Sequence, residues 1–140
     1  MTAKEYLNRV RRQYYVVKQA EEELTAIKAD ILSLKASSMT EHVSGTKESD
    51  LADKYIRLER YFDTVTAEWD RLIGMRIEAK AMIRTLPDET QQAVLYARYI
   101  NCGRWEDIAA DMNYSWKHIF RLHGKALQSF AAIHQSALDN

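Results

Sequence analysis

A row of basic side chains recurs every four residues near the C-terminal end of the sequence. Its members are Lys117, Arg121 and Lys125, and no Asp or Glu occurs between Tyr114 and Leu138. Residues four apart lie on the same face of a helix, so a helix here would present three cations in line. Such side chains contact phosphate oxygens and guanine edges in duplex DNA. The row favours a nucleic-acid contact, although the solvated face of an ordinary helical bundle would carry the same pattern.

The elements around this row have the dimensions of a helix-turn-helix motif. We expect a short helix over Trp105–Met112 and a turn at Asn113-Tyr114, followed by a longer helix. Ser115 is placed to cap that longer helix, which should run past Phe130. A short helix, a three-residue turn and a longer helix are typical of DNA-binding proteins whose second helix enters the major groove. The pattern thus puts the basic row on the helix that would read DNA.

The segment before this motif has boundaries of its own. Pro87 ends the preceding helix, and Asp88 is placed to cap the next one. We expect that helix over residues 89–100 and a turn over residues 101–103. Residues 86–140 hold five Lys or Arg and six Asp or Glu, which gives a net charge of 5 − 6 = −1. Positive charge in this segment is therefore concentrated on one helix.

The first 85 residues follow the pattern of two long amphipathic helices joined by a loop. Apolar residues recur at steps of three and four over residues 2–37 and again over residues 50–85. The intervening residues 38–49 are rich in Ser, Thr and Gly and are expected to form a loop. Neither helix can bury its apolar stripe alone, so we expect an antiparallel hairpin, a homo-oligomeric coiled coil, or both. The second stripe, whose aromatic residues are expected to pack, consists of Leu51, Tyr55, Leu58, Phe62, Val65, Trp69 and Leu72.

Composition bounds the fold class and the compartment. The chain has 140 residues, with 20 Lys or Arg against 20 Asp or Glu, and only four Gly, one Pro and one Cys. So few turn-forming residues favour an all-α fold, with residues 1–85 as the hairpin and residues 86–140 as the helix-turn-helix domain. The single cysteine excludes an internal disulfide. The sequence has no apolar run long enough to span a bilayer and no signal segment, so we expect a cytoplasmic protein without a membrane partner.

The sequence offers little that could perform catalysis. It has no Gly-rich phosphate loop, no HExxH zinc motif and no Gly-x-Ser-x-Gly nucleophile motif. His118 and His123 are five residues apart and do not share a helical face well. Cys102 lies in the expected turn and is expected to be a buried, inert thiol. We therefore expect a protein that is not an enzyme and that uses no metal, no cofactor and no small-molecule substrate.

Residues 86–130 resemble region four of bacterial sigma factors. That family begins with Leu-Pro or Leu-Thr, continues with Val-Leu and Arg-Tyr or Arg-Phe, and then has a glycine turn. A Glu-Glu-Ile-Ala helix, a Ser or Thr, and a helix ending in Lys-Ala-Leu or Arg-Ala-Leu follow. With two long helices before this region, the chain is similar to the ArpU/RinA-like regulators of phages and prophages of Gram-positive bacteria. The matching residues are Leu86, Pro87, Val94, Leu95, Arg98, Tyr99, Gly103, Trp105, Glu106, Ile108, Ala109, Ser115, Ile119, Lys125, Ala126 and Leu127.

The resemblance implies which residues face DNA. Ser115 falls at the helix start, where it meets a phosphate, and Arg104 precedes the motif, where it contacts the opposite backbone. Two departures stand out, because position 104 usually holds a capping Ser or Thr and Phe120 replaces a residue that is usually polar. The implied DNA-facing residues are Arg104, Ser115, Trp116, Lys117, His118, Arg121 and Lys125.

The function that these features indicate is sequence-specific DNA binding by a phage-encoded regulator of transcription, with activation favoured. Duplex DNA is the expected partner, and RNA polymerase and a second copy of the chain are further candidates. The other sigma regions are not recognisable, so a complete sigma factor is not expected. Two alternatives stay open: a coiled-coil adaptor that does not bind DNA, and a small DNA-packaging subunit of a phage, which would assemble into a ring.

Overall fold

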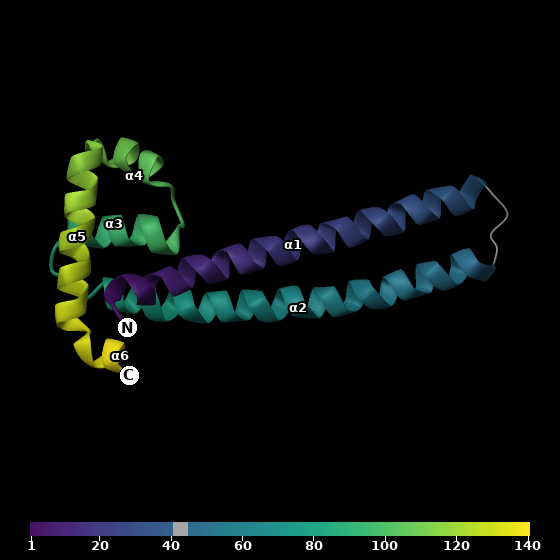
Figure 1. Cartoon of the computed structure of the whole chain (residues 1–140), viewed down its shortest axis with the longest axis horizontal. Helices are drawn as coiled ribbons and strands as arrows, with labels where there is room; N and C mark the ends of the chain where they lie inside the picture. The colour runs from purple at the N-terminus through teal and green to yellow at the C-terminus, as the bar shows by residue number, and fades with distance from the viewer. Residues whose placement is uncertain (41–44) are drawn as a thin grey trace. The chain divides into compact units, whose positions relative to one another are not determined.

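The computed structural model describes the backbone of residues 1–40 and 45–140 and the side chains of residues 1–37 and 49–140. Within these ranges it contains helices and no strand, which confirms the all-α prediction. No helix in this part of the chain is long and apolar enough to cross a membrane. The elements in Figure 1 are α1 (Ala3–Thr40), α2 (Gly45–Ile83), α3 (Glu89–Leu95), a π-helical turn (Tyr96–Ile100), α4 (Trp105–Met112), α5 (Trp116–Ile133) and α6 (Gln135–Asp139).

The chain forms two compact units, which are described separately. The head unit consists of Met1–Tyr14 and Leu72–Asn140, and the hairpin unit consists of Tyr15–Arg71. This division differs from the boundary that we expect near residue 85. The reason is that the first turns of α1 and the last turns of α2 pack with the short C-terminal helices in the head unit.

In the hairpin unit, α1 and α2 run antiparallel. Nε1 of Trp69 donates a hydrogen bond to Oε1 of Glu21 over 2.6 Å, and Nζ of Lys54 pairs with Oδ2 of Asp30 over 3.4 Å. Residue numbers rise along one helix while those of the partners fall along the other, so the predicted pairing of two long helices is confirmed. The buried centre consists of Ala20, Leu24 and Val65, with Leu58, Tyr61 and Trp69 packed against it.

Two aromatic residues of the predicted apolar stripe are exposed to solvent, Phe62 more than Tyr55. Phe62 is 59% exposed, and Tyr55 is 39% exposed. Their neighbour Tyr61 packs against the core in place of Phe62. A straight α-helix drifts by about 20° per heptad relative to a strict seven-residue repeat, so the line of contact moves from one residue to the next. The interpretation of Phe62 as a packing residue is therefore wrong.

The loop expected over residues 38–49 is also corrected at both ends. Helix α1 continues to Thr40 and α2 begins at Gly45, so residues 38–40 and 45–49 are helical. Residues 41–44, the rest of the predicted loop, lie outside the described part of the chain. Extending an existing helix adds one hydrogen bond per residue without a new nucleus, which outweighs the weak helix propensity of Ser and Thr.

The head unit joins the ends of the long helices to the C-terminal helices through one core. The Tyr6 hydroxyl donates a hydrogen bond to Oε1 of Glu78 over 2.6 Å. Nη1 of Arg11 donates to the carbonyl oxygens of Arg98 (2.8 Å) and Gly103 (3.3 Å), so the start of α1 holds the turn that leads into α4. The fully buried large side chains of this unit are Leu7, Leu72, Ile83, Leu86, Val94, Leu95, Tyr99, Ile119 and Phe130.

Candidate nucleic-acid interface

Two side-chain caps fix where helices of the motif begin. Oδ1 of Asp88 accepts hydrogen bonds from the backbone N–H groups of Thr90 (2.8 Å) and Gln91 (3.1 Å), and α3 begins at the next residue. Oγ of Ser115 accepts one from the N–H of His118 over 3.1 Å, and α5 begins directly after it. Each cap satisfies a donor that a helix start leaves unpaired. Both caps confirm predictions made from the sequence.

The turn between α4 and α5 depends on a left-handed residue. Helix α4 spans Trp105–Met112, as predicted, and Asn113 follows with φ 58° and ψ 43°. The N–H of Asn113 returns to the carbonyl oxygens of Ala109 and Ala110, which closes the end of α4. Asparagine adopts this conformation more readily than most residues that carry a side chain. The predicted short helix, tight turn and long helix are therefore present, with α5 ending at Ile133.

The helix expected over residues 89–100 changes type along its length. Helix α3 ends at Leu95, and Tyr96–Ile100 form a π-helical turn closed by a 3.0 Å hydrogen bond from the N–H of Asn101 to the carbonyl oxygen of Tyr96. The predicted helical range is therefore confirmed, and its last five residues are π-helical. The spacing of apolar residues carries no information about which carbonyl each N–H selects, so the sequence could not show this turn.

The connection from the π-helical turn to α4 is tight at two residues. Cys102 has a positive φ of 56°, and burial raises the pKa of its thiol above the usual value. A Cβ added at Gly103 would lie 3.0 Å from the carbonyl oxygen of Ala97 and 3.3 Å from the Ile108 side chain. Glycine is the residue that fits this approach. The turn over residues 101–103 and the burial of Cys102 confirm the sequence prediction.

The inner face of α5 packs into the head unit and includes a histidine. The Tyr99 hydroxyl lies 2.7 Å from Nε2 of His123, and the ring of Trp105 lies against the same imidazole with centroids 4.6 Å apart. Burial, followed by the charges of Lys4 and Arg98, lowers the pKa of His123 to about 4. The imidazole is therefore neutral at neutral pH. His123 is not predicted from the sequence to lie in the core, although it lies four residues after Ile119 and three before Ala126, which is the spacing of one helical face. The buried residues of this face are Ile119, His123, Ala126 and Phe130.

The outer face of α5 carries the basic row. Lys117, Arg121 and Lys125 are all exposed, and none of them forms an ion pair with a carboxylate in the part of the chain that the structure describes. Ser115, Lys117, His118 and Arg121 line an open surface hollow of about 290 Å³. This hollow combines two cations with the N-terminus of a helix, a combination whose positive charge suits an anionic group. Four of the seven predicted DNA-facing residues thus line this hollow.

Arg104 is engaged by neighbouring carboxylates. Its Nη1 lies 3.0 Å from Oε1 of Glu106, and its Nε lies 3.1 Å from Oδ2 of Asp107. The hydrogen bond that Nε of Arg104 donates to Asp107, together with the charges of both carboxylates, raises the pKa of the guanidinium. Arg104 occupies the N-cap position of α4 without making a side-chain capping bond, as its residue type predicts. In this structure Arg104 is therefore paired with carboxylates, whereas no carboxylate of the described residues pairs with the cations of the basic row on α5.

Two aromatic side chains are exposed beside the basic row. Trp116 is 52% exposed and Phe120 is 47% exposed, and their ring centroids lie 5.7 Å apart. Phe120 also meets the Trp105 ring edge-on at 5.2 Å, while His118 stacks on Tyr114 at 4.1 Å. Phe120 is not among the residues that the sequence placed on DNA. Phe120 lies four residues after Trp116, and this spacing could have indicated that the two aromatic side chains share one face of the helix.

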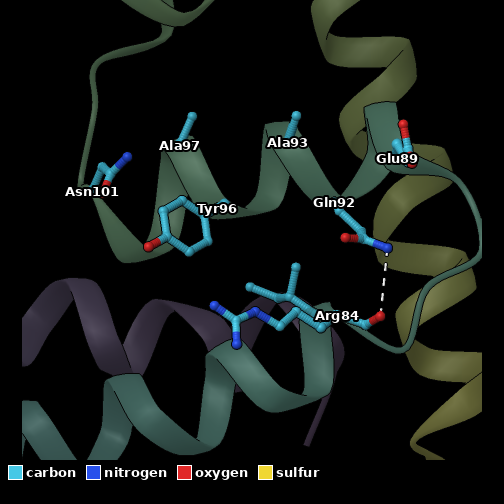
Figure 2. Close-up of a pocket in the computed structure, with 8 residues that line it drawn as sticks. Arg84, Glu89, Gln92, Ala93, Tyr96, Ala97 and Asn101 are labelled. Atoms are coloured by element: carbon cyan, nitrogen blue, oxygen red, sulfur yellow. Dashed lines mark hydrogen bonds between the residues drawn. The ribbon is translucent and has the colours of Figure 1, made fainter.

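A second hollow, of about 380 Å³, lies between the end of α2 and α3 (Figure 2). Figure 2 shows Nε2 of Gln92 reaching the carbonyl oxygen of Arg84, and this group also donates to the carbonyl oxygen of Leu86. Gln92 thus satisfies carbonyl groups that the end of α2 leaves without partners. The hollow thus lies where α3 is bonded to the residues that follow α2. Across the described residues, no three His, Cys, Asp or Glu side chains gather where they could hold a metal ion.

Comparison with known proteins places the chain in a family. Residues 32–131 match the family described as Protein of unknown function (DUF1492). The match begins within α1 and includes all of α2, α3 and α4 and nearly all of α5. No curated protein and no solved structure gives a significant match. Since the matched residues make up more than half of the chain, the protein belongs to the DUF1492 family.

Proposed function

We propose that this protein binds duplex DNA in a sequence-specific manner and regulates transcription, with α5 in the major groove. The observation that carries the proposal is the exposed row of Lys117, Arg121 and Lys125 on the second helix of a helix-turn-helix. The opposite face of the same helix is buried, so α5 has one side for packing and one side for a partner. The whole chain has no net charge, so binding would depend on this local row.

Each residue of the row has a role that its position on α5 supports. The N-terminus of α5, capped by Ser115, offers backbone N–H groups and a favourable dipole to a phosphate. Lys117 and Arg121 lie in the first two turns, from which helix-turn-helix proteins contact base edges. Arginine binds guanine through two parallel hydrogen bonds, which makes Arg121 the main base-reading residue. Lys125, one turn later, contacts the phosphate backbone.

The resemblance to region four of sigma factors supports the same proposal. By this resemblance, RNA polymerase is the second macromolecular partner. The protein would then act as a phage-encoded activator in the bacterial cytoplasm. The DUF1492 match spans both α2 and the helix-turn-helix, which supports a function that uses the two together. Arg104 joins the DNA contact in this proposal by exchanging Glu106 and Asp107 for a backbone phosphate.

The proposed regulator works as a dimer formed by the hairpin unit. Phe62 is 59% exposed and Ile56 is 50% exposed on α2, and Leu32 is 67% exposed on α1. A second copy of the hairpin would bury these side chains, and burial of apolar surface favours association. A two-fold dimer predicts a palindromic operator whose half-sites are about one helical turn, or a multiple of it, apart. Sedimentation of wild type and Phe62→Glu tests this part, because the variant should sediment as a smaller species.

Selection of duplexes from a random pool, followed by affinity measurements at two salt concentrations, tests the DNA-binding proposal. The wild type should yield a consensus sequence, and a Lys117→Ala, Arg121→Ala double variant should lose it. Arg121→Ala alone should lose about 1–3 kcal/mol of discrimination at one base pair. Lys125→Ala should weaken binding to all sequences alike and lower the salt slope by about one.

Arg84→Ala is the matched control, since it removes an exposed cation of the head unit that is not on α5. It should leave both the consensus and the affinity unchanged. Equal losses at every sequence for Arg121→Ala would contradict its assignment to a base. Weak binding without a consensus, unaffected by the double variant, would overturn the proposal and favour the coiled-coil adaptor.

A further inference from the structure

The exposed aromatic pair on α5 consists of Trp116 and Phe120, one helical turn apart. Their ring centroids are 5.7 Å apart, and each side chain is about half exposed. Phe120 is supported from the core side by the Trp105 ring, which meets it edge-on at 5.2 Å. Trp105 in turn lies under the guanidinium of Arg98, at 4.6 Å from the ring centroid, and against His123. The pair is therefore held in place by the core while its outer surface stays free.

The aromatic pair adjoins the basic row along the same two turns of the helix. Trp116 directly precedes Lys117, and Phe120 directly precedes Arg121, so each ring lies about 100° around the helix from a cation. Gly124 continues the line of the pair, and a Cβ added there would meet no atom within 4 Å. The two rings and the glycine therefore form an apolar strip beside the cations, and about half of the surface of each ring is exposed.

Burial of apolar surface is favourable, so two adjoining half-exposed aromatic rings gain free energy when a partner covers them. The partner must also suit the basic row, which flanks the rings and selects an anion. Duplex DNA meets both conditions, because it has phosphates beside its grooves and one apolar group on its major-groove edges. That group is the 5-methyl group of thymine.

We propose that Trp116 and Phe120 contact thymine methyl groups in the major groove, beside the bases or phosphates that the basic row contacts. This inference rests on the proposed function and adds the base that the aromatic residues select. The recognised sequence then contains thymine next to the guanine bound by Arg121. Discrimination comes from two chemistries on neighbouring lines of one helix, with hydrogen bonds on one line and apolar contacts on the other.

Replacement of thymine by uracil in the selected duplex tests this inference directly. Uracil lacks only the methyl group and keeps the same base pairing, so any loss of affinity measures the methyl contact. The full-length wild type should bind a duplex about fourfold more weakly for each contacted methyl group removed, as expected for the burial of one carbon. Phe120→Ala and Trp116→Ala should each bind the thymine duplex more weakly, and each should lose the response to uracil only at the thymine that its own ring contacts.

Two variants control for effects on folding. Phe120→Leu keeps an apolar side chain and should retain most of the response to uracil. Ile133→Ala removes another exposed apolar side chain, 46% exposed, from the far end of the same helix and should change nothing. Thermal unfolding of each variant shows whether the head unit remains folded at the temperature of the binding measurement.

The outcomes separate this inference from the proposed function. If thymine and uracil duplexes bind the wild type equally, while binding still depends on salt and on Lys117 and Arg121, the methyl contact is overturned and DNA reading stands. If no duplex binds above a random sequence, both fail. If the duplexes bind equally and Phe120→Ala loses RNA polymerase instead, the aromatic pair is a protein contact.

Discussion

The Tyr99 hydroxyl lies 2.7 Å from Nε2 of His123, and this contact links the π-helical turn to the middle of α5. Both residues are buried, with Tyr99 1% and His123 7% exposed. Burial raises the pKa of Tyr99 to about 12 and lowers that of His123 to about 4, so both groups are neutral near pH 7. A hydrogen bond between two neutral buried groups fixes orientation without a buried charge. The outward direction of the basic row therefore depends on a contact on the inner side of α5.

Acid should destabilise the head unit through His123. The unfolded chain takes up a proton on this imidazole near pH 6.5, whereas the folded chain resists protonation until about pH 4. Between these pH values the unfolded state binds more protons than the folded state, so the free energy of unfolding falls as the pH falls. Below about pH 4 both states are protonated at His123, and this contribution no longer changes. The loss should be at most about 3 kcal/mol. Urea unfolding at pH 7, 5.5 and 4.5 measures it.

His123→Gln is the comparison, because glutamine can keep a neutral hydrogen bond to Tyr99 but does not titrate. The difference in free energy of unfolding between wild type and variant should shrink as the pH falls, because only the wild type loses the contribution of His123. The carboxylates contribute equally to both proteins and cancel in the difference. A difference that stays constant over this range would show that His123 does not resist protonation in the folded chain.

Removal of the Arg11 guanidinium should destabilise the turn into α4. Arg11→Met leaves the carbonyl oxygen of Arg98 without this donor, while that of Gly103 keeps a 2.9 Å hydrogen bond from Nη1 of Arg98. The expected cost is about 1–3 kcal/mol in the free energy of unfolding by urea. Arg12→Met, on the exposed side of the same helical turn, should stay within about 0.5 kcal/mol of wild type. Equal losses in both variants would point to helix propensity or net charge instead.

Asn113 should be replaceable by glycine but not by alanine. Its left-handed backbone costs a residue with a Cβ roughly 1–2 kcal/mol, and asparagine carries less of this cost than most. Asn113→Ala should therefore lower stability by about 1 kcal/mol, whereas Asn113→Gly should leave it nearly unchanged. Thermal melts followed by circular dichroism distinguish the two. If glycine is as harmful as alanine, the side chain of Asn113 matters more than its backbone.

Two glycines should respond in opposite ways to alanine. A Cβ at Gly124 meets nothing within 4 Å, so Gly124→Ala should stabilise α5 by about 1 kcal/mol through helix propensity alone. A Cβ at Gly103 meets the carbonyl oxygen of Ala97 at 3.0 Å, so Gly103→Ala should destabilise the protein. Denaturant midpoints of the two variants against wild type provide the measurement. A loss of stability in Gly124→Ala would mean that something covers this part of α5 in solution.

Local signals are sufficient to predict the helix boundaries of the motif. Asp88 and Ser115 cap helices with bonds to residues two or three positions ahead, and a capping preference of that range is visible in the sequence. The apolar spacing along α5 is likewise a local signal, and it predicts the burial of Ile119 and Phe130. The exposure of the basic row follows because a helix with one buried face must turn the other face outward.

Features that depend on distant partners could not be predicted in this way. His123 lies on the apolar face of α5, but its hydrogen-bond partner Tyr99 comes 24 residues earlier, and no local spacing connects the two. The exposure of Phe62 depends on how α1 lies against α2, which a stripe along one helix does not determine. The ion pair between Arg104 and Asp107 differs from these features, because the two residues are only three positions apart and their spacing is visible in the sequence.

The discontinuous head unit has a consequence for the order in which the protein is made. Tyr6 and Arg11 leave the ribosome early, yet their partners Glu78 and Arg98 follow 72 and 87 residues later. The hairpin unit, in contrast, has all of its residues before any of the short helices are synthesised. Contacts between nearby segments close faster than those between distant ones, so the hairpin should form first. A nascent chain stalled before residue 116 could already pair its long helices while having no surface with which to contact DNA.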